Sequence, residues 1–205
     1  MFAKRMILLA AVLGVGCQEL DGVEEGADLL SEGALAQQGA STATSAVRQP
    51  RYDERGRLIK PTDTDRWVFL GSGLNLNYTD GAQGGADFFT TTYMEPSAYQ
   101  AFVDTGVFPE GTMTALVGYR AGSGAPPAKS GKYLGERALF EMSVKDSTKN
   151  PKDVWTYYGF RGDATLGEAH PTERCQSCHV KNAQTDLVFT QFYPNLRKPT
   201  SAPAR

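Results

Sequence analysis

The motif that most constrains this chain lies near its C-terminal end, where Cys175 and Cys178 stand three residues apart and His179 follows directly. A Cys-x-x-Cys-His segment suits three kinds of chemistry: covalent attachment of a haem, coordination of zinc, or a redox disulfide. Each would give the protein a different task, so the rest of the chain must decide among them.

The sequence lacks features that a zinc site or a redox disulfide would need. A structural zinc site takes four ligands, but the chain has only one other histidine, His170, and no second cysteine pair. A thioredoxin-like pair opens a helix within a βαβ unit, and the sequence shows no such alternation. Haem attachment needs two thiols for the vinyl groups and an adjacent imidazole for iron. The motif therefore favours one covalently attached haem c, with Cys175 and Cys178 as attachment points and His179 as the iron ligand.

The N-terminal residues indicate export. Lys4 and Arg5 precede an apolar run over residues 6–15, which is too short to span a bilayer but fits a secretory signal. The run ends in a small residue and Cys17, an arrangement that resembles a bacterial lipobox, although Gly14 stands where that pattern has leucine. We predict a signal peptide over residues 1–16 and lipidation of Cys17, with plain secretion and a retained anchor as alternatives. All three place the domain outside the cytoplasm. With Cys17 lipidated, we expect a periplasmic or outer-membrane lipoprotein whose only membrane contact is its lipid.

Composition separates a tether from a folded domain. Residues 17–50 are first acidic and then small and polar, with little apolar surface to offset the entropy of ordering them, so we predict a disordered tether. Residues 51–205 hold most of the aromatic side chains and form the predicted domain. The net charge of −2 and pI near 5.7 give no basic surface for phosphate backbones, so nucleic acid is not expected as a partner.

The domain reads as an α+β fold, mainly antiparallel sheet with a few short helices. Pro96 and Gly106 bracket a helix with apolar residues at helical spacing, and Asn182 to Tyr193 reads as a second helix. Gly, Ser and Pro over 122–127 predict a loop. The predicted strands, rich in aromatic and β-branched residues, are 67–78, 88–94, 113–119, 137–145 and 154–160.

Several separated motifs resemble the cytochrome P-460 family, which includes cytochrome c′-beta. They are "YMEPSAYQAF", "TGVFPEGT", "MSVKDS...VWTYYGF" and "HPTERCQSCHVKNAQTDLVFTQFYPNLR", in this order over about residues 66–197. The resemblance implies a mainly antiparallel β domain, usually a homodimer, with one haem c. It implies covalent attachment at Cys175 and Cys178, His179 as proximal ligand, and an opposite iron face open to small gases or hydroxylamine.

One departure from the family bears on activity. Members that oxidise hydroxylamine carry a lysine cross-linked to the porphyrin, expected four residues beyond the threonine of "FPEGT". Here that position is Leu116, and no lysine occurs between Lys60 and Lys129. A leucine cannot form the cross-link. An apolar face above iron suits NO or CO, which bind ferrous haem without a hydrogen-bond donor.

Other residues are candidates for the open side of the haem. Leu116 with Phe88, Phe89 and Phe102 would form an apolar surface there, or these residues would simply fill the sheet core. Glu136 and Glu141 are candidate general bases, or solvated strand carboxylates. His170 is either a ligand or proton shuttle or, in a loop before proline, a surface residue. Met94, Met113 and Met142 are candidate sixth ligands or core packing.

Three functions remain open on sequence grounds. The favoured one is a five-coordinate haem c protein that binds a small gas such as NO. The second is an oxidoreductase that oxidises hydroxylamine or NO on the same haem and passes electrons to an acceptor. The third is an electron-transfer cytochrome, which needs a strong sixth ligand.

Overall fold

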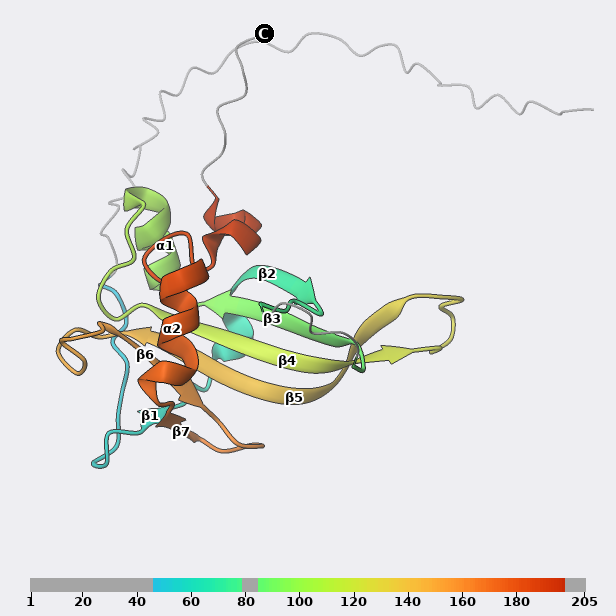
Figure 1. The fold of residues 1–205 in the computed structure, drawn as a ribbon, viewed down its shortest axis with the longest axis horizontal. Helices are drawn as coiled ribbons and strands as arrows, with labels where there is room; N and C mark the ends of the chain where they lie inside the picture. The colour runs from blue at the N-terminus through green and yellow to red at the C-terminus, as the bar shows by residue number, and fades with distance from the viewer. Residues whose placement is uncertain (1–45, 79–84, 198–205) are drawn as a thin grey trace, which may run out of the picture. The chain divides into compact units, whose positions relative to one another are not determined.

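The computed structural model of the chain describes residues 46–78 and 85–197. Over these residues, seven strands form one antiparallel sheet in the order β1-β7-β6-β5-β4-β3-β2 (Figure 1). The strands are β1 (Leu58–Ile59), β2 (Val68–Leu74), β3 (Phe88–Met94), β4 (Met113–Ser123), β5 (Lys132–Lys145), β6 (Trp155–Gly159) and β7 (Leu166–Ala169). The helices are α1 (Pro96–Thr105) and α2 (Thr172–Asn182), with 3₁₀ turns at Thr64–Arg66, Thr190–Phe192 and Pro194–Leu196. The predicted α+β class is confirmed.

The hairpin of β4 and β5 is longer than predicted and projects beyond its neighbours in Figure 1. Strand β4 continues to Ser123, and β5 already begins at Lys132. Gly122, one of the residues that indicated a loop, lies within β4. A Cβ at this position would collide with the ring of Tyr133 on β5, so the ring lies across the strand at this point.

Helix α1 begins and ends where its sequence predicts. The Glu95 carboxylate accepts a hydrogen bond from the backbone N–H of Ala98, and Pro96 occupies the first turn. Gly106 ends the helix in the left-handed conformation, with φ of 75°.

The prediction of a second helix over Asn182 to Tyr193 is wrong. The second helix, α2, instead contains the Cys-x-x-Cys-His motif and ends at Asn182. The segment that follows is irregular, and Asp186 and Leu187 have positive φ values of 44° and 60°. Its apolar residues have helix-like spacing, but they pack from a loop and a 3₁₀ turn against the sheet and α2.

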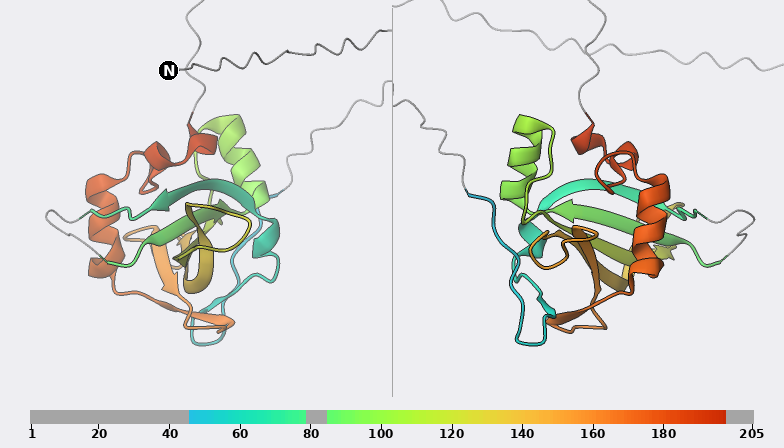
Figure 2. Two further views of the ribbon diagram at one scale, coloured as in Figure 1. Left: turned by 90° about the vertical axis from the view of Figure 1, so that its right-hand side faces the viewer. Right: turned by 60° about the vertical axis from the view of Figure 1, so that its left-hand side comes forward.

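Side-chain alternation along the strands produces two core clusters, one on each face of the sheet. The first cluster contains Leu58, Trp67, Met113, Ala115, Val117, Phe140, Met142, Val144, Tyr158 and Phe160. The second contains Leu70, Met94, Ala98, Phe102, Phe108, Trp155, Tyr157, Val188 and Leu196. Residues of α1 and of the segment after α2 belong to this second cluster, and Cys175 of α2 packs against it, so the helical elements cover that face (Figure 2).

The described part of the chain begins within the predicted tether. Val47 packs against the second core cluster, and Arg48 pairs with Asp63 at 2.8 Å. The predicted signal peptide, Cys17 and most of the tether lie outside the described residues. None of the helices in the described ranges is long and apolar enough to cross a bilayer.

Candidate functional site

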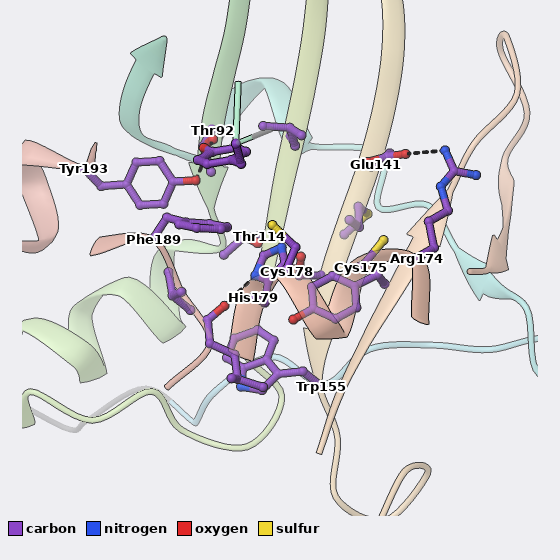
Figure 3. A pocket seen from close by; sticks show the side chains of 17 residues that line it. Thr92, Thr114, Glu141, Trp155, Arg174, Cys175, Cys178, His179, Phe189 and Tyr193 are labelled. Carbon is purple, nitrogen blue, oxygen red and sulfur yellow. Dashed lines mark hydrogen bonds and ion pairs between the residues drawn. The ribbon is translucent and has the colours of Figure 1, made fainter. Parts of the chain in front are cut away.

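The motif borders a cavity of about 240 Å³ between the sheet and α2 (Figure 3). Strands β3 to β6 form one side, α2 carries the motif, and the segment after α2 closes a third side. Its lining residues are Tyr78, Thr92, Thr114, Leu116, Glu141, Met142, Ser143, Trp155, Tyr157, Arg174, Cys175, Cys178, His179, Leu187, Val188, Phe189 and Tyr193.

Helix geometry brings the three motif residues together. Cys175, Cys178 and His179 stand at positions i, i+3 and i+4 of α2, so they share one face of the helix, and all three line the cavity. Both cysteines are free thiols. Glu173 lies in the first turn of the helix, where a carboxylate interacts favourably with the helix dipole.

His179 is held in one orientation. Its Nδ1 lies 2.6 Å from the carbonyl oxygen of Leu187, so Nδ1–H donates and Nε2 keeps its lone pair. The rings of Tyr157 and Phe189 flank the imidazole, with centroids 4.5 and 4.7 Å away. Burial lowers the pKa of His179, although the Leu187 carbonyl works against that shift. The imidazole is therefore neutral, fixed and ready to bind a metal through Nε2.

The structure gives no support to the zinc and disulfide alternatives. In residues 46–78 and 85–197, no group of three or more His, Cys, Asp or Glu side chains is arranged to hold a metal ion. Burial and the nearby Glu141 raise the pKa of Cys175. A redox-active cysteine needs a lowered pKa, so Cys175 lacks the property that a thioredoxin-like pair requires.

Opposite the motif, β3, β4 and β5 form what we call the strand wall: Thr92, Thr114, Leu116, Glu141 and Ser143, all lining the cavity. Leu116 pairs with Thr92 on one side and with Glu141 on the other, so these three form one row across the sheet. The wall is less apolar than the sequence suggested, because hydroxyl groups surround the one leucine.

Only part of the predicted apolar surface lies at the cavity. Leu116 lines it, but Phe88, Phe89 and Phe102 do not. Phe88 and Phe89 lie on β3 beside Arg120 and Tyr119, towards the projecting hairpin. Phe102 is stacked on Phe108 within the second core cluster, with ring centroids 4.1 Å apart. The structure therefore does not bring these three phenylalanines to the cavity lining, because apolar character alone does not indicate which part of the sheet borders the cavity.

The two candidate carboxylates also differ. Glu136 is exposed on the projecting part of β5 and is not at the cavity. Glu141 lines it and lies 3.1 Å from His170 Nε2 and 3.8 Å from an Arg174 guanidinium nitrogen. His170 is 14% exposed and its ring packs over Gly159, so the surface alternative for this histidine is wrong.

Sequence reasoning missed the aromatic lining of the cavity. Trp155 and Tyr157 alternate on one face of β6, a signal that the strand pattern already contained. Tyr193 reaches the wall and hydrogen-bonds Thr92 at 3.2 Å, and Tyr78 stacks on Phe189. Burial raises the pKa of Tyr78 to about 12 and also raises those of Tyr157 and Tyr193. These phenols are therefore neutral at pH 7.

The methionines serve as core packing. Met94 and Met113 are buried in the two core clusters. Met142 touches the cavity but is 1% exposed and belongs to the cluster on the opposite face of β5.

Comparison with known families agrees with this site. The sequence model of cytochrome P460 matches residues 61–190, which include the motif, the strand wall and both helices. The chain belongs to the cytochrome P460 family. It matches none of the curated proteins with which it was compared. Family membership makes it a haem-binding cytochrome, as the sequence motifs predicted.

The residues at the cavity of this cytochrome P460 protein fit a haem. His179 offers a free Nε2, two thiols lie on the same helix face, and flat aromatic rings line the space between them. The hydroxyl of Tyr157 is buried without a hydrogen-bond partner in the described part of the chain, at a cavity that it lines. A group bound there would supply contacts that the protein alone does not.

Proposed function

We propose that the chain carries one haem c, attached through thioethers to Cys175 and Cys178 and ligated by His179. Three observations support this assignment. The thiols are free, the three side chains share one face of α2, and the Leu187 carbonyl selects the tautomer that leaves Nε2 available. Bound there, the haem supplies an iron centre for ligand binding and one-electron chemistry.

We further propose that the protein binds a small gas, NO above all, on the side of the haem opposite His179. The observation that carries this proposal is the composition of the strand wall and of the cavity lining beside it: Leu116 stands at the centre of the wall, and neither the wall nor Tyr193 and Met142 next to it offers a residue suited to a sixth position on iron. Tyr193 is a neutral phenol, Glu141 is paired with His170 and Arg174, and Met142 packs into the opposite core. NO binds ferrous haem without a hydrogen-bond donor, so such a wall is sufficient.

Optical absorption of the reduced protein, with and without NO, tests this function. We expect a five-coordinate, high-spin spectrum that changes when NO is added. A six-coordinate, low-spin spectrum that does not change when NO is added would contradict gas binding and favour electron transfer.

Glu141 supports a second candidate, the oxidation of hydroxylamine or NO. It is the one carboxylate of the strand wall and lies in the same row as Leu116, where a general base would have to be. Reduction of an added electron acceptor on addition of hydroxylamine measures this activity. Glu141→Gln should abolish such turnover and leave NO binding intact, and Glu136→Gln, on the exposed part of β5, is the matched control. Absence of any turnover by the unaltered protein rejects this candidate.

We also propose that the protein is exported, is anchored through a lipid on Cys17, and forms homodimers. The N-terminal pattern and the need to attach haem outside the cytoplasm support export, and the family resemblance supports the dimer. Labelling with radioactive palmitate, compared between the protein and Cys17→Ser, tests the anchor. Sedimentation of the purified domain tests the dimer.

A further inference from the structure

The segment that supplies the Leu187 carbonyl is shaped in an unusual way. We call residues 183–189 the proximal loop. Within it, Asp186 and Leu187 both have positive φ, 44° and 60°, and neither is glycine. Such conformations are costly for residues with a Cβ and persist only when surrounding contacts impose them.

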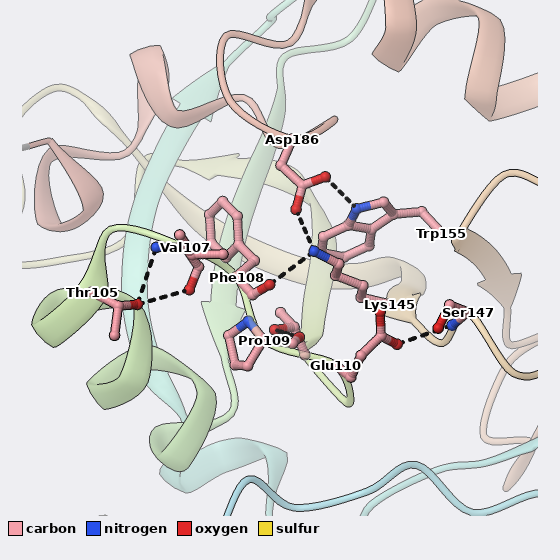
Figure 4. Close-up of polar contacts among 10 residues, drawn as sticks. Thr105, Val107, Phe108, Pro109, Glu110, Lys145, Ser147, Trp155 and Asp186 are labelled. Atoms are coloured by element: carbon pink, nitrogen blue, oxygen red, sulfur yellow. Dashed lines mark hydrogen bonds and ion pairs between the residues drawn. The ribbon is translucent and has the colours of Figure 1, made fainter.

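Asp186 provides those contacts, and both of its carboxylate oxygens are used (Figure 4). Oδ2 accepts a hydrogen bond from Lys145 Nζ at 2.8 Å, and Oδ1 accepts one from Trp155 Nε1 at 3.3 Å. Lys145 Nζ also donates to the carbonyl oxygen of Phe108 at 2.8 Å. The loop is thus fastened to β5, to β6 and to the segment after α1.

The two donors to Asp186 are themselves fixed. The side chain of Lys145 is only 15% exposed, and Trp155 is 2% exposed and packs edge-on against Phe108. The Asp186 side chain is itself 37% exposed, so solvent screens part of the ion pair, and the hydrogen bond from the enclosed Trp155 indole adds to the hold on the carboxylate. Asp186 is therefore held in place, and the peptide that follows it has little freedom.

That peptide is the one that orients the proximal histidine. The carbonyl of Leu187, directly after Asp186, accepts the 2.6 Å hydrogen bond from His179 Nδ1. A partner on the second ring nitrogen of a ligating histidine fixes the ring and raises its basicity. A chain of contacts thus runs from Lys145 and Trp155 through Asp186 and Leu187 to the imidazole.

We propose that Asp186 is a positioning residue for His179. By holding Leu187 in its positive-φ conformation, Asp186 keeps the Leu187 carbonyl hydrogen-bonded to His179 Nδ1–H. That hydrogen bond sets how strongly the imidazole donates electrons to iron. This inference rests on the proposed role of His179 as iron ligand. Asp186 touches neither His179 nor the cavity, so its influence passes through the backbone.

Asp186→Asn tests the proposal on the intact haem protein. Asparagine tolerates positive φ, so this change removes the charge and weakens the Lys145 contact without forbidding the loop conformation. We expect a weaker hydrogen bond at Nδ1, a less basic imidazole and a higher reduction potential of the haem. In the reduced, five-coordinate form, the iron–histidine stretching band should move to lower frequency.

Two further variants make the result decisive. Lys145→Met removes the ammonium donor to Asp186 at a position that does not line the cavity, and should shift the potential in the same direction. Asp163→Asn removes the 2.5 Å pair with Arg137 at an exposed site and should not shift it. If Asp186→Asn lowers the melting temperature but leaves the potential and the stretching band unchanged, Asp186 has a structural role alone and the proposal fails.

The reduction potential can be measured whether or not iron has a sixth ligand. A low-spin spectrum of the unaltered protein that does not change when NO is added would therefore contradict gas binding. The comparison of reduction potentials between the unaltered protein and Asp186→Asn would still be decisive. Conversely, an unshifted potential in Asp186→Asn with normal NO binding rejects the role of Asp186 alone.

Discussion

The proximal loop and the strand wall face each other across the cavity but are held by different forces. The loop keeps a costly backbone shape through one ion pair, one indole hydrogen bond and an enclosed lysine. The wall is ordinary antiparallel sheet, in which backbone bonds hold the strands and the side chains that face the cavity contribute little to the fold. Changes in the loop should therefore alter both the reduction potential of the bound haem and the stability of the fold. Changes in the wall should alter ligand binding alone.

The largest effect is expected at the motif that faces both regions. Replacing both Cys175 and Cys178 by serine removes the thioether bonds, so covalently bound haem should fall to zero. Haem-specific staining after denaturing electrophoresis measures this loss. Ser177→Ala changes an exposed residue of the same helix and should retain full attachment. Haem that stays bound to the double variant under denaturing conditions would disprove the attachment points.

A smaller effect, on stability, should separate two ion pairs of β5. Lys145→Met leaves the part-buried Phe108 carbonyl and the 37% exposed Asp186 without their donor, which should cost about 1 kcal/mol. Arg137→Met breaks a pair whose carboxylate is 96% exposed, and should cost less than about 0.5 kcal/mol. Urea denaturation of both variants gives the difference. Equal costs would mean that the proximal loop is not held by Lys145.

These two regions also mark the limit of sequence reasoning. Strand positions such as 88–94, and helix α1 with its Pro96 and Gly106, follow local rules and were predictable. The motif itself indicated the cofactor. The conformation of Asp186 and Leu187 was not predictable, because it depends on Lys145 and Trp155, which lie more than thirty residues away in the sequence. Tertiary contacts imposed an irregular loop on a segment whose apolar spacing suggested a helix.

The extent of the cavity along the sheet shows a second limit. Phe88 shares a sheet face with Thr92 and Leu116, and Phe102 belongs to the core cluster on that same face, yet of these apolar residues only Leu116 lines the cavity. Alternation along a strand says which residues share a face, but not which part of that face the cofactor occupies. His170 shows the same difficulty: a histidine before proline reads as a surface residue, and only the packing of β6 and β7 brings it to Glu141.

At the wall, Leu116→Met should change ligand binding without changing the fold. A flexible thioether at this position can reach iron and compete with the gas, so the apparent affinity for NO should fall by about tenfold or more. Volume-conserving core substitutions usually cost less than about 1.5 kcal/mol, so stability should change little. The reduced spectrum should become low-spin. Leu116→Ile is the matched control without sulfur, and an unchanged spectrum in both variants would place Leu116 away from the open face of iron.

The smallest effect concerns the pH dependence of stability in the haem-free protein. Burial lowers the folded pKa of His179 below its unfolded value of about 6.5, so the unfolded chain binds the proton more readily. Stability from this group is full above the unfolded pKa and falls as pH drops through it, until the folded pKa is reached. The slope cannot exceed about 1.4 kcal/mol per pH unit for one proton.

Urea titrations at pH 7.5 and 5.5 on the His170→Gln protein isolate His179, because these are the only two histidines. A stability that rises on acidification, or the same dependence after His179→Gln, would show that the imidazole is not buried against the Leu187 carbonyl and that the proximal loop does not hold it.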